Sequence, residues 1–197
     1  MTAKDFRDRA RAALAGKWNK FALAALIFAL LSGAVNGLPG VGQVVSLIVT
    51  GPLTFGMVLI SLFVIRGADF DVSKLFDGFK DFARVFCLYL VNSIFVFLWS
   101  LLFVIPGIIK ALAYAMSGYI LADDPAISQA DARKLSMKMM EGNKGRLFCL
   151  YLSFIGWIFL SMLAFCIPLF WVIPYMQTAT AAFYEDVRAS YAAKQPA

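Results

Sequence analysis

The chain has 197 residues, of which 61% are hydrophobic and 15% are charged. Soluble domains average about 45–50% apolar and about 25% charged residues, so this composition excludes an ordinary water-soluble domain and indicates an integral membrane protein. The net charge of +6 would suggest nucleic-acid binding in a soluble chain. Here Lys and Arg flank apolar runs, where they fix orientation in a membrane, so we expect no nucleic-acid partner.

The N-terminal segment is rich in Lys and Arg and precedes the first apolar run. That run leads into Asn36 and a Pro39-Gly40 turn, and a second apolar run follows. A secretory signal would instead end in a short cleavage site of small residues. The pattern therefore favours a first helical hairpin over a removed signal peptide.

Six apolar runs approach the length of about 20 helical residues that crosses a bilayer core of about 30 Å. Turns containing proline separate the two runs of each pair, which predicts three hairpins. The fourth and sixth runs are the shortest, so they either extend into the interface or are partly re-entrant. The expected spans are Phe21–Leu38, Val41–Ile65, Val85–Ile105, Gly107–Ala122, Leu147–Ile167 and Leu169–Tyr184.

The charged residues gather outside these spans. Every Lys and Arg except Lys110, and all 12 acidic residues, lie at the N-terminus or in segments 66–84, 122–146 and 185–197. These four segments share one side of a three-hairpin protein. The positive-inside rule makes that side cytoplasmic, so both termini are expected in the cytoplasm.

A heptapeptide repeats within the chain. Arg84–Leu90 (RVFCLYL) returns 62 residues later as Arg146–Leu152 (RLFCLYL), and Ile105-Pro106 returns as Ile167-Pro168 at the same offset. The acidic pair Asp123-Asp124 likewise returns as Glu185-Asp186. Self-similarity in one register indicates repeated structural units.

A weaker third copy lies at the N-terminus, where Gly16 precedes the first hairpin much as Gly78 and Gly142 precede the later ones. We therefore expect one membrane domain over residues 1–197. Its repeat units would cover approximately residues 1–66, 67–124 and 125–188, and residues 189–197 would form a C-terminal tail.

Each unit is expected to begin with a cytoplasmic amphipathic helix. Phe6, Ala10 and Leu14 share a face of the first such helix, and Ser128-x-x-Asp131 resembles a capping box that starts the third. Such helices either lie in the membrane interface beside anionic lipid head groups or pack under the bundle. A candidate cytoplasmic interaction surface is formed by Arg133, Lys134 and Lys138.

Several strings, taken together, resemble a known family. They are Leu75–Phe79, Ile105–Lys110, Ile120–Asp123, Leu152–Trp157, Pro174-Tyr175 and Ala182–Tyr184. The chain from Gly51 to Tyr184 resembles the bacterial multi-pass family known as domain of unknown function 975. The resemblance implies a protein of the bacterial cytoplasmic (inner) membrane, and it implies no activity because the family is uncharacterised.

Lys110 is the only charged side chain within an expected span, and ionisable residues inside membranes are functional candidates. Because it lies four residues from the outer turn, it could equally extend to the interface. Polar residues on the second helix of each hairpin suggest a polar seam that lines a passage, binds a head group or only joins helices. Its candidate residues are Lys110, Tyr114, Ser117, Tyr175, Gln177 and Thr178.

Enzyme chemistry has little support in the sequence. The chain has no histidine, no acidic residue within an expected span and no phosphate-binding or nucleophile motif, so we expect no enzyme, no metal and no cofactor. The acidic pairs are interpreted as helix ends that pair with Arg84 or Arg146. The three cysteines lie in apolar runs without metal-site spacing and are interpreted as packing residues.

Two functions remain open. The first is a non-enzymatic scaffold, accessory or envelope-associated factor that acts through its cytoplasmic surface. The second is a transporter or channel for a small solute, an anion or a lipid, with the polar seam around Lys110 as its path. A membrane-protein partner or a second copy of the chain is compatible with both.

Overall fold

The computed structural model describes residues 2–37, 42–163 and 168–194, and every regular element in them is a helix. The expected turns at Pro39-Gly40 and around Cys166 fall outside these residues. The elements, in chain order, are α1 (Ala3–Leu14), α2 (Trp18–Asn36), α3 (Gly42–Ile65), η1 (Val72–Phe79), α4 (Phe82–Leu102), α5 (Val104–Tyr114), α6 (Ser117–Asp123), α7 (Gln129–Met139), α8 (Lys144–Leu163) and α9 (Leu169–Ala192).

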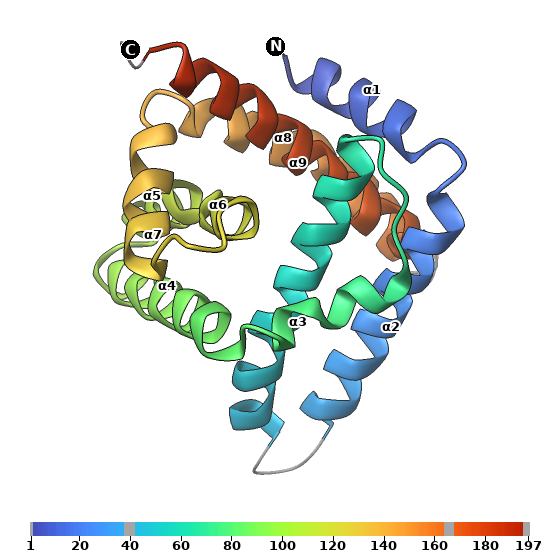
Figure 1. The fold of residues 1–197 in the computed structure, drawn as a ribbon, viewed down its shortest axis with the longest axis horizontal. Helices are drawn as coiled ribbons and strands as arrows, with labels where there is room; N and C mark the ends of the chain where they lie inside the picture. The colour runs from blue at the N-terminus through green and yellow to red at the C-terminus, as the bar shows by residue number, and fades with distance from the viewer. Residues whose placement is uncertain (1, 38–41, 164–167, 195–197) are drawn as a thin grey trace.

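Long helices come in three consecutive pairs, α2–α3, α4 with α5–α6, and α8–α9, and the members of each pair pack together. A shorter helix precedes each pair. Figure 1 shows the three pairs around the centre of the molecule, each running in a different direction, with both chain ends along one edge. The first and third pairs also contact each other, because both α2 and α3 pack against α9.

Five stretches of the described helices are long and apolar enough to cross a membrane: Trp18–Val35, Ile48–Ile65, Phe82–Leu101, Val104–Asp123 and Lys144–Ser161. The fourth runs through α5 and α6, so the short fourth run predicted from sequence is longer than expected. Helix α9 is outside this set because Gln177, its threonines and the Glu185-Asp186 pair lower its hydropathy.

The first helix of each pair is peripheral and the second is central. Only 22% of the α2 stretch, 11% of the α4 stretch and 22% of the α8 stretch are buried, against 61% for α3 and 50% for α5–α6. The peripheral helices present large apolar side chains outward, for example Leu101 at 74% and Phe159 at 71% exposure. Such a surface matches the hydrocarbon core of a bilayer and would be unfavourable in water.

The short helices α1 and α7 pack against the long helices. Thr2 and Asp5 form a reciprocal capping box that starts α1, and Phe6, Ala10 and Leu14 are buried against α8 and α9. Helix α7 begins at the Ser128 cap predicted from sequence, and its buried Ser136 donates to the Ala113 carbonyl of α5 over 2.7 Å.

The second short element differs from the expected amphipathic α-helix. It is a 3-10 helix, η1, separated from α4 at Asp81. Leu75 is buried, whereas Phe76, Phe79 and Phe82 are exposed and form a row of ring contacts that continues to Phe86. Because a 3-10 helix has three residues per turn, residues spaced by three fall on one face.

Two glycines allow η1 to lie directly on α3. A Cβ at Gly56 would overlap the Leu75 backbone, and one at Gly78 would overlap the Pro52 backbone. Gly16 and Gly142 have a different role: both have φ of 77° at the ends of α1 and α7, where side chains are disfavoured. The three glycines that looked equivalent in the sequence therefore serve two purposes.

Gly56→Ala should force α3 and η1 apart and destabilise the protein by about 1–3 kcal/mol, the usual cost of overpacking. Thermal unfolding in detergent measures the effect. Gly33→Ala is the matched control, because a Cβ there meets nothing within 4 Å. Equal melting temperatures for the two variants would show that the crossing of α3 and η1 is not close.

Candidate functional site

The ends of the three central helices meet at one carboxylate. Asp123, the last residue of α6, accepts hydrogen bonds from Arg66 at 2.6 and 2.9 Å, from Arg188 at 2.7 Å and from the Tyr184 hydroxyl at 2.9 Å. Arg66 also donates to Glu185 over 2.7 Å. We call these five residues the ionic junction, which joins the end of α3 to α6 and α9.

Within the ionic junction, the Asp123 carboxylate is shielded from solvent, whereas the two arginines are more exposed. The Asp123 side chain is 8% exposed, whereas those of Arg66 and Arg188 are 42% and 52% exposed. A buried carboxylate is stable only when it is paired and hydrogen-bonded, and Asp123 has donors from two other segments. The sequence placed acidic residues at this helix end, but it gave no sign that Arg66 and Arg188 are their partners.

The peripheral helices are joined to the same end of the molecule by basic residues near their starts. Arg146 of α8 pairs with Asp186 over 2.6 Å, as predicted from sequence. Arg84 of α4 donates instead to the backbone carbonyls of Asp124 and Ile127. Lys20 of α2 pairs with Asp69 over 3.1 Å, and this hydrogen bond lowers the pKa of the Asp69 carboxyl.

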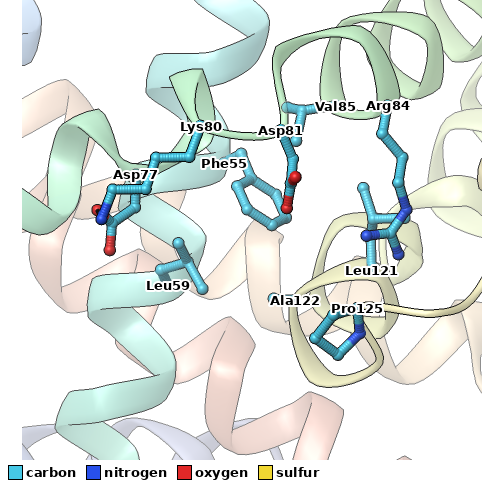
Figure 2. Close-up of a pocket in the computed structure, with 10 residues that line it drawn as sticks. All are labelled: Phe55, Leu59, Asp77, Lys80, Asp81, Arg84, Val85, Leu121, Ala122 and Pro125. Atoms are coloured by element: carbon cyan, nitrogen blue, oxygen red, sulfur yellow. Dashed lines mark ion pairs between the residues drawn. The ribbon is translucent and has the colours of Figure 1, made fainter.

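A cavity of about 200 Å³ lies beside the junction, between the η1–α4 connection and the end of α6. Figure 2 shows the Asp81 carboxylate between Lys80 on one side and the Arg84 guanidinium on the other, with Phe55, Leu59 and Leu121 as apolar walls. Asp77 pairs with Lys80 over 2.7 Å and with Lys74 over 2.9 Å. Burial opposes ionisation of Asp77, but these lysines lower its pKa below the ordinary value.

The structure does not bring Lys110 to the expected polar seam. Its ammonium lies 5.0 Å from the centre of the Trp99 ring on the neighbouring peripheral helix, a cation–π arrangement. Tyr114 is buried with its ring 6.4 Å from that of Phe95. Ser117 accepts from Asn92 over 2.9 Å and donates to the Tyr114 carbonyl.

The remaining seam candidates lie on α9. Tyr175 packs against Phe154 with ring centres 5.1 Å apart, and Arg11 lies 6.0 Å from the centre of its ring. Thr178 donates to the Pro174 carbonyl of its own helix over 2.8 Å. Gln177 reaches the Tyr119 hydroxyl only at 3.5 Å.

Tyrosines that sequence reasoning did not select surround Gln177. Tyr119 of α6 stacks on Tyr184 with ring centres 5.3 Å apart, and the Tyr89 hydroxyl lies beside Gly118 of the same helix. Tyr151 lines a cavity of about 200 Å³ with Met176, Gln177 and Thr180. Tyr89 and Tyr151 are the tyrosines of the repeated heptapeptide, so the repeat could have marked them as candidate site residues.

The candidate interaction surface divides into two parts. Lys134 and Lys138 are exposed, and Lys134 lies 3.6 Å from Asp131. Arg133 is half-buried, with its guanidinium 5.2 Å from the centre of the Phe95 ring. Arg133 is therefore in part a packing residue between α7 and α4.

In the described part of the chain, no group of three His, Cys, Asp or Glu side chains could hold a metal ion. Cys87 and Cys149 are both free thiols.

These features define an all-helical protein with five stretches suited to crossing a membrane. The chain belongs to the family of proteins of unknown function DUF975, whose model matches residues 1–112 and 101–191. Comparison with curated proteins and with solved structures gave no significant match.

Asp123→Asn should weaken the ionic junction, because the neutral amide leaves Arg66 and Arg188 without their shared counter-charge. We expect a loss of roughly 1.5–3 kcal/mol, the range for hydrogen bonds to charged groups, with solvent exposure of both arginines favouring the lower end. Thermal unfolding in detergent measures it. Asp124→Asn is the control, because within the described parts of the chain that exposed carboxylate accepts only from the Ala126 N–H. Equal losses in both variants would contradict the assignment.

Proposed function

We propose that the chain is a bacterial cytoplasmic-membrane protein with six spans in three tandem hairpins, and that it acts as a non-enzymatic scaffold, accessory or envelope-associated factor. Both termini would lie in the cytoplasm with the ionic junction. The distribution of charge supports this placement, since every Lys and Arg except Lys110 lies outside the apolar spans expected from sequence, in segments that three hairpins would put on one side. The exposed lysines of α7 would offer a surface to a protein partner or to anionic lipid.

The hydrogen bonding of the central helices carries the proposal. Ser61, Ser117, Thr178 and Thr180 all donate to carbonyls three or four residues earlier in the chain. Such hydroxyls are already satisfied by their own helices and are not directed at a passing solute. A passage needs polar groups or a ring of charges that can replace the hydration shell of the solute.

Burial supports α9 as the sixth span in spite of its lower hydropathy. Its stretch from Thr178 to Tyr184 is buried among other helices, so these residues need not be as apolar as those that face lipid.

The peripheral helices α2, α4 and α8 begin in similar ways, which supports three tandem hairpins built on the same plan. Phe21, Val85 and Leu147 each follow the basic residue near the start of their helix, and each is at most 1% exposed. Lys20 and Arg84 bond to residues just beyond the ends of α3 and α6, and Arg146 bonds to Asp186 in the C-terminal part of α9.

A transporter or channel is the second candidate, and the surroundings of Gln177 favour it. Its amide has only a 3.5 Å contact with Tyr119 and lines the cavity that Tyr151 and Thr180 share. An amide with this freedom could bind an uncharged polar group. Lys110, in contrast, lies against Trp99 away from this cavity.

The scaffold proposal predicts that charge reversal on α7 impairs function more than removal of Lys110. Lys134→Glu combined with Lys138→Glu changes exposed charges while leaving Arg133 on Phe95. Complementation of a deletion strain, at matched expression, should fail with this double variant and succeed with Lys110→Ala.

The reverse order would contradict the scaffold proposal. A solute flux in proteoliposomes that Lys110→Met or Gln177→Leu abolishes would establish the second candidate in its place. Asp8→Asn is a suitable control for flux, because Asp8 is an exposed residue of α1 outside the seam.

A further inference from the structure

Asp81 stands where a helix cap is expected but does not act as one. Aspartate before the first helical residue ordinarily accepts a hydrogen bond from a backbone N–H of the first turn. Asp81 precedes Phe82, the first residue of α4, and its side chain makes no such bond. Among the described residues its exposed carboxylate has no hydrogen bond or ion pair, and Figure 2 shows it directed into the cavity.

The cavity combines both signs of charge with an apolar side. Asp81 supplies a free carboxylate, Arg84 supplies a cation, and Phe55, Leu59 and Leu121 supply apolar walls. Asp77 and Lys80 also line the cavity, but they pair with each other. Its volume of about 200 Å³ is below the roughly 300–1,000 Å³ of pockets that enclose a drug-sized ligand. The cavity therefore suits a small head group whose remainder lies outside it.

The surroundings favour a lipid as the source of that head group. The cavity lies between the start of α4 and the end of α6, against the middle of α3, and next to charged segments that we place at the cytoplasmic surface. The row of Phe76, Phe79 and Phe82 on the same η1–α4 segment is 37–45% exposed. Exposed aromatic rings at a helix end suit the boundary between head groups and acyl chains.

We propose that this cavity binds the head group of a zwitterionic phospholipid with a primary ammonium, such as phosphatidylethanolamine. The ammonium would donate to Asp81, and the phosphate would lie against Arg84, because the Lys80 ammonium is directed to Asp77 on the other side of the cavity. A primary ammonium offers N–H groups to the carboxylate in a small space, whereas a trimethylated choline offers none and is bulkier. A purely anionic head group would leave Asp81 unpaired and repelled. The inference rests on the proposed placement of this end at the membrane surface.

The third repeat unit also has a cavity, and its lining differs from that of the Asp81 cavity in the second repeat unit. Counted 62 residues on, Asp77, Asp81 and Pro125 correspond to Met139, Asn143 and Val187, all three of which line a cavity of about 240 Å³. The two cavities thus occupy the same place in their units. The later one has Met139 and Asn143 in place of the two aspartates, and its carboxylate, that of Glu141, stands at a different position.

Native mass spectrometry of the detergent-purified full chain tests the proposal, because it measures lipid retention regardless of orientation in a membrane. Phosphatidylethanolamine, phosphatidylglycerol and phosphatidylcholine are each added at equal concentration. We expect phosphatidylethanolamine to be retained most. Asp81→Asn should weaken its binding roughly tenfold, the effect of one lost charge-assisted hydrogen bond, and remove the preference over phosphatidylcholine.

Asp8→Asn is the matched control, since Asp8 is an exposed aspartate of α1 that does not line this cavity, and it should retain the preference. Soluble glycerophosphoethanolamine, added as a competitor, should displace the lipid only weakly if the acyl chains contribute to lipid binding. Equal or stronger retention of phosphatidylglycerol by the unaltered chain would overturn the proposal, as would unchanged binding in Asp81→Asn. Neither result would bear on the scaffold function, which the α7 variants test separately.

Discussion

A membrane-embedded chain must keep its charges out of hydrocarbon, and here several of them pair where the C-terminal parts of α3, α6 and α9 meet. Asp123 is the centre of the arrangement, because one shielded carboxylate receives Arg66 from the end of α3 and Arg188 and Tyr184 from α9. The central helices of all three pairs are thereby fixed relative to one another. Basic residues at the starts of α4 and α8 attach the peripheral helices to the same region.

This arrangement determines what the rest of each helix can do. With these charges paired, the peripheral helices can present continuous apolar surfaces, and the central helices can carry hydroxyls that bond within their own turns. Gly56 and Gly78 let η1 lie against α3, which brings Asp77, Lys80 and Asp81 close to the end of α6. The cavity beside the junction therefore results from the same packing that positions the charges.

The long helices could be predicted from the sequence, because apolar runs are local signals. The expected turn at Pro106-Gly107 was wrong, since α4 and α5 are separated at Phe103 and Pro106 lies in the first turn of α5. The pairing of Arg146 with Asp186 followed from the 62-residue repeat. The Asp123 partners could not be found this way, since Arg66 and Arg188 reach it only through the packing of three helices. Similarly, Lys110 shares a stripe of its helix with Tyr114, yet packing directs it to Trp99. Nothing in the sequence singled out Asp81, and only the geometry shows that its side chain does not cap α4.

Orientation of the junction is the central claim, and cysteine labelling across the membrane tests it most directly. Ser190 follows the junction on α9 and is exposed, and Phe103, at the connection of α4 and α5, is 73% exposed. Each would be changed to cysteine in a chain whose three native cysteines are replaced by serine, and intact spheroplasts would be treated with a membrane-impermeant maleimide. We predict labelling of Phe103→Cys in intact cells and of Ser190→Cys only after permeabilisation. Labelling of Ser190→Cys in intact cells would contradict six spans with a cytoplasmic junction.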